Sequence, residues 1–178
     1  FYVAGYAETD GPLGTVAVAE ALNQLGFHSV VVTDKYCKGF FELKQLDVEY
    51  VDIAADEQVY EDILDKYNPV YMISIERCGE NAEHEYANMR GVSITSETAA
   101  IDHLFELAPE KHIPTIGVGD GGNEIGMGNV KDIISEKLEL NPCVVPVDDL
   151  IIATTSNWGA YALTAWLQKL SGEEVLFT

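Results

Sequence analysis

Short runs of β-branched and apolar residues alternate with segments of helical periodicity along almost the whole chain. The expected strands cover residues 1–5, 29–33, 48–53, 70–75, 114–118 and 150–154. The expected helices cover residues 15–25, 40–46, 57–67, a segment that begins at Ser96 as N-cap and includes Ala108, 130–138 and 158–170. Strands that alternate with helices pair in parallel. The sequence therefore predicts an α/β fold, a three-layer, doubly wound, mostly parallel sheet with helices on both faces.

The length and composition favour one domain. The chain has 178 residues, of which 47% are hydrophobic, and it shows no internal repeat and no Pro/Ser-rich linker. This is enough for one well-buried core and too little for two ordinary domains with separate cores. We expect residues 1–178 to form a single α/β domain.

The charge excludes several classes of partner. Thirty Asp and Glu against ten Lys and Arg give a formal net charge of −20, which repels phosphate backbones and anionic lipid surfaces. No apolar run approaches the roughly 18 residues needed to span a bilayer. We expect neither nucleic acid nor membrane as partner, whereas acidic loops are compatible with a divalent cation, Mn or Mg.

The three cysteines, Cys37, Cys78 and Cys143, are odd in number and contain no Cys-x-x-Cys pair. This speaks against a disulfide framework or a structural zinc site and favours a reducing compartment such as the cytoplasm. The four histidines form no zinc-binding pattern, and only His84 lies in a polar loop that follows an expected strand.

Ligands of open α/β sheets bind beyond the carboxyl ends of the strands, so the segments that follow the strands carry the candidate residues. After the first expected strand come Glu8 and Asp10, then Gly11 and Pro12. Asp10 either caps a helix that starts at Pro12 or, with Glu8, offers carboxylate oxygens to a cation or a base to the reaction. Both interpretations stay open at this point.

Charge appears abruptly at the end of the expected strand 70–75, where Glu76 and Arg77 follow an apolar run. Such charges are costly unless they are paired or used. They form a salt bridge with each other, or Arg77 offers its forked donors to a substrate carboxylate. Arg90 is the second candidate for that role.

The most unusual segment is 117–128, in which six of twelve residues are glycine. Such a loop favours backbone freedom over side-chain packing, so Gly121 and Gly122 are expected to present N–H groups to an anion. Asp120, Asn123 and Glu124 supply oxygen ligands or proton transfer. The segment matches neither a P-loop nor a dinucleotide fingerprint, and we expect no nucleotide cofactor.

After the last expected strand come Ser156, Asn157 and Trp158. Ser156 or Asn157 is expected to cap the final helix, and Trp158 to form a wall of the pocket. Capping alone is an equally good interpretation for Ser156.

Taken together, the segments 8–14, 75–79, 117–128 and 156–163 resemble the family of C-terminal domains that includes D-glutamate cyclase, with Gly-Asp-Gly-Gly-Asn-Glu-Ile-Gly-Met-Gly as the most distinctive string. The resemblance covers nearly the whole chain. It implies a carbon–oxygen lyase that interconverts D-glutamate and 5-oxo-D-proline with loss of water. It also implies a cytoplasmic protein in bacteria, or part of a longer mitochondrial matrix protein in animals. The chain departs from the family where the first strand leads almost directly into Glu8, because relatives have a longer loop there.

For this reaction we expect Asp120, Glu124 and Asn123 to be the catalytic residues. Glu8 and Asp10 are the expected metal ligands. Contacts to a small acidic amino-acid substrate are expected from Arg77, Glu76, Gly121, Gly122, Ser156, Asn157 and Trp158. Two alternatives remain: a metal-dependent hydrolase of a small acidic lactam or amide, and a non-catalytic domain that binds a small acid. The residues leave the oligomeric state open, and a homo-oligomer is compatible with them.

Overall fold

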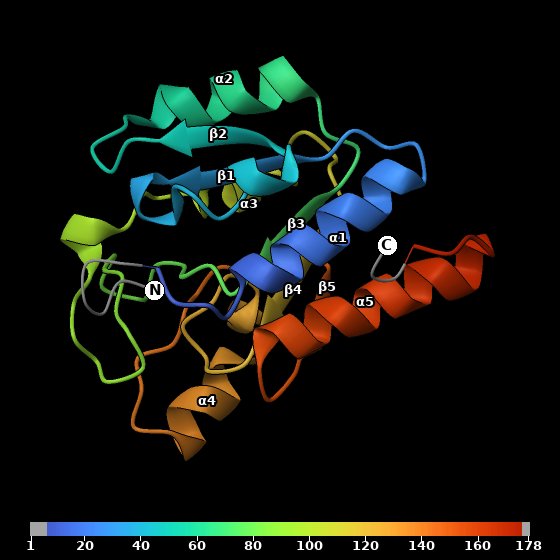
Figure 1. The fold of residues 1–178 in the computed structure, drawn as a ribbon. Helices are drawn as coiled ribbons and strands as arrows, with labels where there is room; N and C mark the ends of the chain where they lie inside the picture. Colours follow the sequence, from blue (N-terminus) through green and yellow to red (C-terminus); the bar gives the residue numbers. More distant parts are fainter. Residues whose placement is uncertain (1–6, 176–178) are drawn as a thin grey trace.

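A computed structural model describes residues 7–175 of the chain (Figure 1). The strand expected at residues 1–5 lies outside the described residues. The helices are α1 (Pro12–Gln24), α2 (Glu57–Tyr67), α3 (His103–Leu107), α4 (Lys131–Lys137) and α5 (Ser156–Ser171). The strands are β1 (Val30–Asp34), β2 (Asp47–Val51), β3 (Met72–Ile75), β4 (Thr115–Gly119) and β5 (Asp149–Ile152).

All described strand pairs are parallel, as predicted. Strand β1 pairs with β2, and β3, β4 and β5 pair in that order. The α/β fold is therefore confirmed. Within residues 7–175 the strands form two hydrogen-bonded sheets, so the single doubly wound, three-layer sheet stays a prediction.

The two faces of the sheet β3–β5 are covered by different parts of the chain. Helices α1 and α5 lie side by side against one face (Figure 1), and a Cβ on Gly159 of α5 would lie 2.7 Å from Val118 of β4. A Cβ on Gly117, the residue before Val118 in β4, would instead lie close to Ile125 and Val147 on the opposite side of the strand. Strand residues alternate between the faces, so residues 117 and 118 show that both faces are packed.

Two predicted helices differ from the structure. Segment 40–46 forms only a 3₁₀ turn, Glu42–Lys44, because Gln45 adopts the left-handed conformation with φ of 55° and ends it. Ser96 does not cap a long helix. It lies in a 3₁₀ turn, its hydroxyl bonds Glu97, and Thr98 is extended, so α3 starts only at His103.

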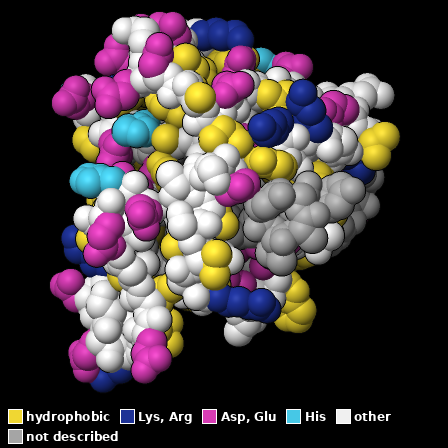
Figure 2. Space-filling model, turned by 90° about the vertical axis from the view of Figure 1, so that its left-hand side faces the viewer, with side chains coloured by type: hydrophobic (Ala, Val, Ile, Leu, Met, Phe, Trp, Pro, Cys, Tyr) yellow, Lys and Arg dark blue, Asp and Glu magenta, His cyan; other side chains and the backbone are white. Residues whose placement is uncertain are grey.

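The loops beyond the carboxyl ends of the strands carry the candidate residues. Figure 2 shows the face toward which the arrowhead of β2 points in Figure 1. Asp and Glu side chains are spread over this face, and Lys and Arg appear in only a few places. No helix within residues 7–175 is long and apolar enough to cross a membrane.

Candidate active site

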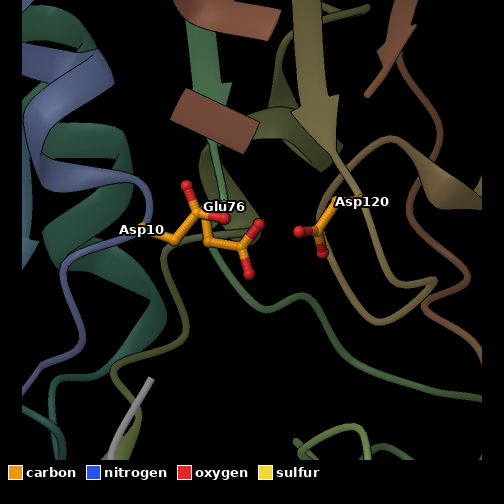
Figure 3. A group of neighbouring side chains, drawn as sticks. All are labelled: Asp10, Glu76 and Asp120. Atoms are coloured by element: carbon orange, nitrogen blue, oxygen red, sulfur yellow. The ribbon is translucent and has the colours of Figure 1, made fainter. Parts of the chain in front are cut away.

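Three carboxylates from distant parts of the chain meet at one point (Figure 3). Asp10 precedes α1, Glu76 follows β3 and Asp120 follows β4. One carboxylate oxygen of each lies within 4.8 Å of the others. We call these residues the carboxylate cluster. The cluster joins one predicted metal ligand, one predicted substrate contact and one predicted catalytic residue.

Glu76 is the buried member of the cluster. The residue is 9% exposed, and its backbone has a φ of 56°, which is uncommon for a residue other than glycine. Burial, and then the negative charge of Glu124, raise the pKa of Glu76 to about 9. The hydroxyl of Ser156 donates a hydrogen bond of 2.5 Å to its carboxylate. Unusual backbone conformation and a perturbed pKa often coincide at functional sites.

Asp120 lies at the outer side of the cluster. The residue is exposed, but its carboxyl group turns toward Asp10 and Glu76 (Figure 3). Partial burial of this group, followed by the charges of Glu124 and Asp10, raises the pKa of Asp120 to about 7. These pKa values place a protonated carboxyl group at Glu76 at neutral pH, and comparable protonated and ionised populations at Asp120.

Glu8, the other predicted metal ligand, is half-buried beside this cluster. Burial raises the pKa of Glu8, and the negative charge of Asp10 contributes to the rise. Among the described residues, the group of carboxylates that meet within 4.8 Å consists of Asp10, Glu76 and Asp120 and does not include Glu8.

Asp10 is held in place by α5. Its carboxylate accepts hydrogen bonds from the backbone N–H groups of Ser156 (3.1 Å) and Asn157 (2.7 Å). In return, the Asn157 side-chain oxygen accepts from the N–H groups of Gly11 (3.0 Å) and Gly14 (2.7 Å) at the start of α1. Each side chain satisfies donors that the first turn of a helix leaves free. Asp10 therefore caps α5, not the helix that it precedes.

The predicted roles at the start of α5 change accordingly. The N-cap position is Thr155, while the Ser156 hydroxyl bonds Glu76 and the Asn157 side chain caps α1. The prediction that Ser156 or Asn157 caps the final helix is therefore wrong. It failed because the donors of α5 are satisfied from a distant loop. Trp158 is 69% exposed in the first turn of α5.

Glu124 closes the glycine-rich loop on itself. The residue is fully buried, and its carboxylate accepts from the N–H groups of Gly121 (2.9 Å) and Gly122 (2.7 Å). The donors expected to bind a substrate anion are thus engaged by a side chain of the same loop. This arrangement gives Glu124 a role in holding the loop and in setting the charge that Glu76 and Asp120 experience.

Asn123 is 2% exposed and points away from solvent. Its side-chain nitrogen donates to the carbonyl of Ala87 at 2.7 Å, while its side-chain oxygen has no hydrogen-bond partner among the described residues. Asn123 thereby connects the glycine-rich loop to the segment that follows β3.

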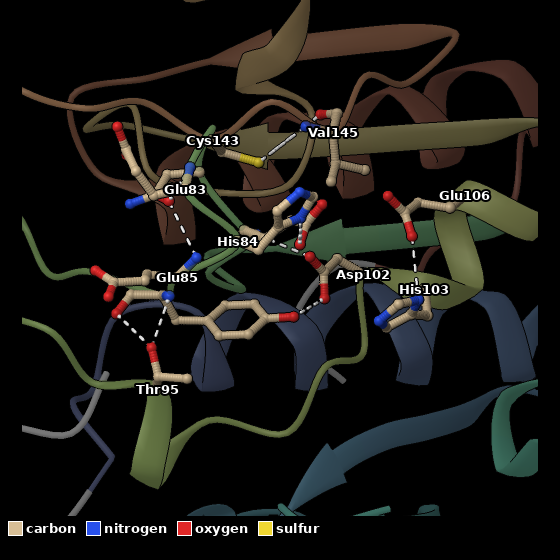
Figure 4. Close-up of polar contacts among 12 residues, drawn as sticks. Glu83, His84, Glu85, Thr95, Asp102, His103, Glu106, Cys143 and Val145 are labelled. Atoms are coloured by element: carbon tan, nitrogen blue, oxygen red, sulfur yellow. Dashed lines mark hydrogen bonds and ion pairs between the residues drawn. The ribbon is translucent and has the colours of Figure 1, made fainter. Parts of the chain in front are cut away.

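That segment is anchored to the N-terminal end of α3. Asp102, which is 1% exposed, accepts from the Tyr86 hydroxyl (2.6 Å) and from the N–H of Glu80 (2.8 Å). The hydroxyl of Thr95 accepts from the N–H of Tyr86. Figure 4 shows Asp102 and Thr95 within these polar contacts. The contacts of Tyr86 therefore also hold the adjacent carbonyl of Ala87, which accepts the hydrogen bond from Asn123.

Arg77 is bound within the protein. Its guanidinium donates to Asp34 (2.6 Å) and to the carbonyl of Ala99 (2.6 Å), while Nε has no partner among the described residues. The salt bridge at this point thus joins Arg77 to Asp34, not to Glu76. A small pocket beside this pair is lined by Glu76, Arg77, Cys78 and Asp34 together with residues from the 94–98 loop.

Asp34 is the residue that the sequence interpretation missed. It is 3% exposed at the carboxyl end of β1, which is the same kind of position that identified Glu76 and Asp120.

The other candidates lie apart from the cluster. Arg90 is exposed, and His84 is exposed and pairs with Glu80 at 3.0 Å. Cys37, Cys78 and Cys143 are free thiols.

Comparison with known proteins places these features in a family. The family described as D-glutamate cyclase-like, C-terminal, matches residues 1–177. Human mitochondrial D-glutamate cyclase is 34% identical over 186 residues, a match that covers 92% of this chain and 30% of the human protein. The chain thus spans less than a third of the length of this relative. Because the family match extends over nearly all of the sequence, the chain belongs to the D-glutamate cyclase-like family.

Proposed function

We propose that the chain is a D-glutamate cyclase-like lyase that interconverts D-glutamate and 5-oxo-D-proline. The observation that carries this proposal is the carboxylate cluster. It combines two carboxyl groups of different acidity at the strand ends of a family member whose human relative is named D-glutamate cyclase. Pairs of titratable groups with separated pKa values are typical of acid–base catalysis.

The reaction requires both an acid and a base. A bond forms between the α-amino nitrogen and the γ-carboxyl carbon, one C–O bond of that carboxyl group breaks, and water leaves. Once a proton has passed from the α-ammonium group to the γ-carboxylate, the neutral amine must lose one further proton and the departing hydroxyl group must gain one to leave as water. We assign proton removal to Asp120, whose pKa of about 7 suits a base at neutral pH, and proton donation to Glu76.

The protonated state of Glu76 also suits an anionic substrate. A carboxylate ligand would be repelled by an ionised cluster, but a protonated carboxyl group donates a hydrogen bond to it. Ser156 and the α5-bound Asp10 keep Glu76 and its neighbours in position. The Nε of Arg77 has no partner among residues 7–175 and lies beside the pocket that Glu76 lines, and we propose it as the donor for the α-carboxylate.

The cluster also fits a divalent cation of the Mn or Mg type. Carboxylate oxygens are the hard ligands that such ions prefer, and the three oxygens converge within 4.8 Å. We propose Asp10, Glu76 and Asp120 as the ligands, in place of the Glu8–Asp10 pair. A cation would displace protons from these oxygens, so a cluster that holds one would not act as the acid and base assigned above. The cation would instead polarise the carboxyl group under attack.

Proton NMR of the chain with D-glutamate, L-glutamate and 5-oxo-D-proline tests the proposal, with Mn²⁺, with Mg²⁺ and with a chelator. We expect interconversion of the D-forms only, and a loss of at least about 100-fold in Glu76→Gln and in Asp120→Asn. Glu61→Gln, an exposed change on α2, is the matched control. No conversion under any condition would refute the lyase. Binding without turnover would indicate a small-acid-binding domain. Cleavage of other lactams or amides would indicate a hydrolase.

A further inference from the structure

Helix α5 turns an apolar surface toward solvent. Trp158, Trp166 and Leu170 are 69%, 54% and 78% exposed, and Ala162 and Ala165 between them are also exposed. Residues separated by four, seven or eight positions lie on one side of a helix. These five residues therefore form one continuous surface, the α5 stripe, on the side of the helix that faces away from α1 and β4.

The α5 stripe lies on a helix that has no acidic residue, although the chain as a whole is very acidic. Helix α5 (Ser156–Ser171) contains no Asp or Glu, although the chain has 30 of them. Its single charged residue is Lys169, whose ammonium lies 4.3 Å from the centroid of the Trp166 ring. An apolar, carboxylate-free helix face exposed on a chain of charge −20 needs a physical reason.

We propose that the α5 stripe is the contact through which two copies of this chain form a dimer. Two molecules of charge −20 repel each other wherever their carboxylates face, so a stable contact between copies requires a surface without them. A basic partner would be attracted to the acidic faces, and an anionic membrane would be repelled. Of these occupants, a second copy is the one that offers a matching surface without carboxylates. This proposal is independent of the catalytic one.

The size of the stripe agrees with a two-fold contact. The exposed parts of two Trp side chains, Leu170 and the two alanines amount to on the order of 500 Å² per copy. A symmetric pair would then bury about 1,000 Å², which is the lower bound for a specific interface. Each copy would contribute the same residues, as two-fold symmetry requires. Trp is also the residue type most enriched among those that dominate binding energy.

Light scattering during size-exclusion chromatography measures the mass directly. We expect twice the chain mass of 19.5 kDa, and a dimer that becomes tighter as added salt screens the repulsion between the copies. Trp166→Glu places a carboxylate from each copy in the contact, and we expect the dissociation constant to rise by about 100-fold. Leu43→Glu changes a side chain that is 86% exposed outside α5, and it should leave the dimer intact.

Ala162→Cys provides a second readout that does not depend on the stability of the dimer. Oxidation of this variant should produce a cross-linked pair, whereas Gln58→Cys, exposed on α2, should stay monomeric. A wild-type monomer at all protein and salt concentrations would overturn the proposal. So would a dimer that survives Trp166→Glu without Ala162→Cys cross-linking, or a monomer that uses the stripe to bind phosphatidylcholine vesicles.

Discussion

Asp10 and Asn157 each cap the helix that starts beside the other. The carboxylate of Asp10 accepts hydrogen bonds from the first N–H groups of α5, and the side-chain oxygen of Asn157 accepts hydrogen bonds from N–H groups at the start of α1. The exchange fixes the two helices against each other where a Cβ on Gly14 would lie only 2.7 Å from Ala160. It also fixes the Asp10 carboxylate at the cluster, so the stability of the helix pair and the geometry of the site depend on the same contacts.

Asn157→Ala is expected to lower the free energy of unfolding by about 2 to 3 kcal/mol. The change removes a cap from α1 and the hydrogen bond that Asn157 donates to the Thr9 carbonyl. Denaturant unfolding measures the effect. Asn141→Ala, at an exposed position, should change it by less than about 0.5 kcal/mol. Equal effects of the two substitutions would contradict the reciprocal caps.

Glu76→Gln is expected to change how stability depends on pH. The folded chain keeps a proton on Glu76 up to about pH 9, whereas the unfolded chain releases it near pH 4.5. Between these values the folded state binds more protons, so wild-type stability falls as pH rises, by up to about 1.4 kcal/mol per pH unit. Gln carries no proton to lose, and the variant should show a flatter profile. Parallel profiles from pH 5 to 9 would show that Glu76 titrates normally.

Asp34→Asn is expected to destabilise the fold by about 3 kcal/mol, because it leaves the Arg77 guanidinium buried without a counter-charge. Adding Arg77→Met removes that charge, so the double variant should be more stable than Asp34→Asn alone. The exposed Asp65–Lys111 pair is the control, where Asp65→Asn should cost less than about 1 kcal/mol. Simple additivity of the Asp34 and Arg77 effects in thermal unfolding would argue against their coupling.

Gly128→Ala is expected to cost about 3 kcal/mol in stability. An added Cβ would lie 2.4 Å from the carbonyl oxygen of Val144, a backbone atom that cannot move aside cheaply. Gly39 has a φ of 95° and open space around it, so Gly39→Ala should cost only about 1 kcal/mol, from backbone strain. Denaturant unfolding of both variants distinguishes the cost of the steric overlap at Gly128 from the cost of backbone strain at Gly39. The reverse order would show that the 126–128 turn is not packed against residues 144 and 145.

A bound cation is expected to raise the melting temperature of the wild-type chain. Mg²⁺ and Mn²⁺ replace protons on the cluster, so the increase should grow from pH 6 to pH 8 as those protons become easier to displace. Asp120→Asn should show little increase, and Glu61→Gln should behave as wild type. An increase that is the same in all three proteins would place the cation elsewhere.

The strand ends were predictable because the signal is local. Glu76 and Asp120 are charged residues that follow apolar runs, and that position alone places them at the carboxyl edge of a parallel sheet. The same reasoning would have found Asp34. The repeated glycines beside Asp120 added a signal that needs no tertiary information.

The assignments that failed depended on distant partners. Nothing near Asn157 in the sequence shows that its side chain reaches Gly11, and nothing near Arg77 shows that Asp34 accepts from it. Ser96 has the sequence of an N-cap, but the hydroxyl of Thr98 bonds the carbonyl of Ile94 and the chain leaves the helical path there. Long-range contacts decided the roles of Asn157 and Arg77, whereas at Ser96 a local side-chain hydrogen bond competed with the helix.

The exchange of caps between Asp10 and Asn157 has a consequence for the order in which the site forms during synthesis. The two residues are 147 positions apart, and closing so long a loop comes late because its entropy must be offset by contacts already made. A nascent chain that has not yet released α5 from the ribosome has neither the cap for α1 nor the fixed Asp10. The carboxylate cluster therefore takes its final geometry only after α5 has packed against the rest of the chain, however well the sheets have formed before.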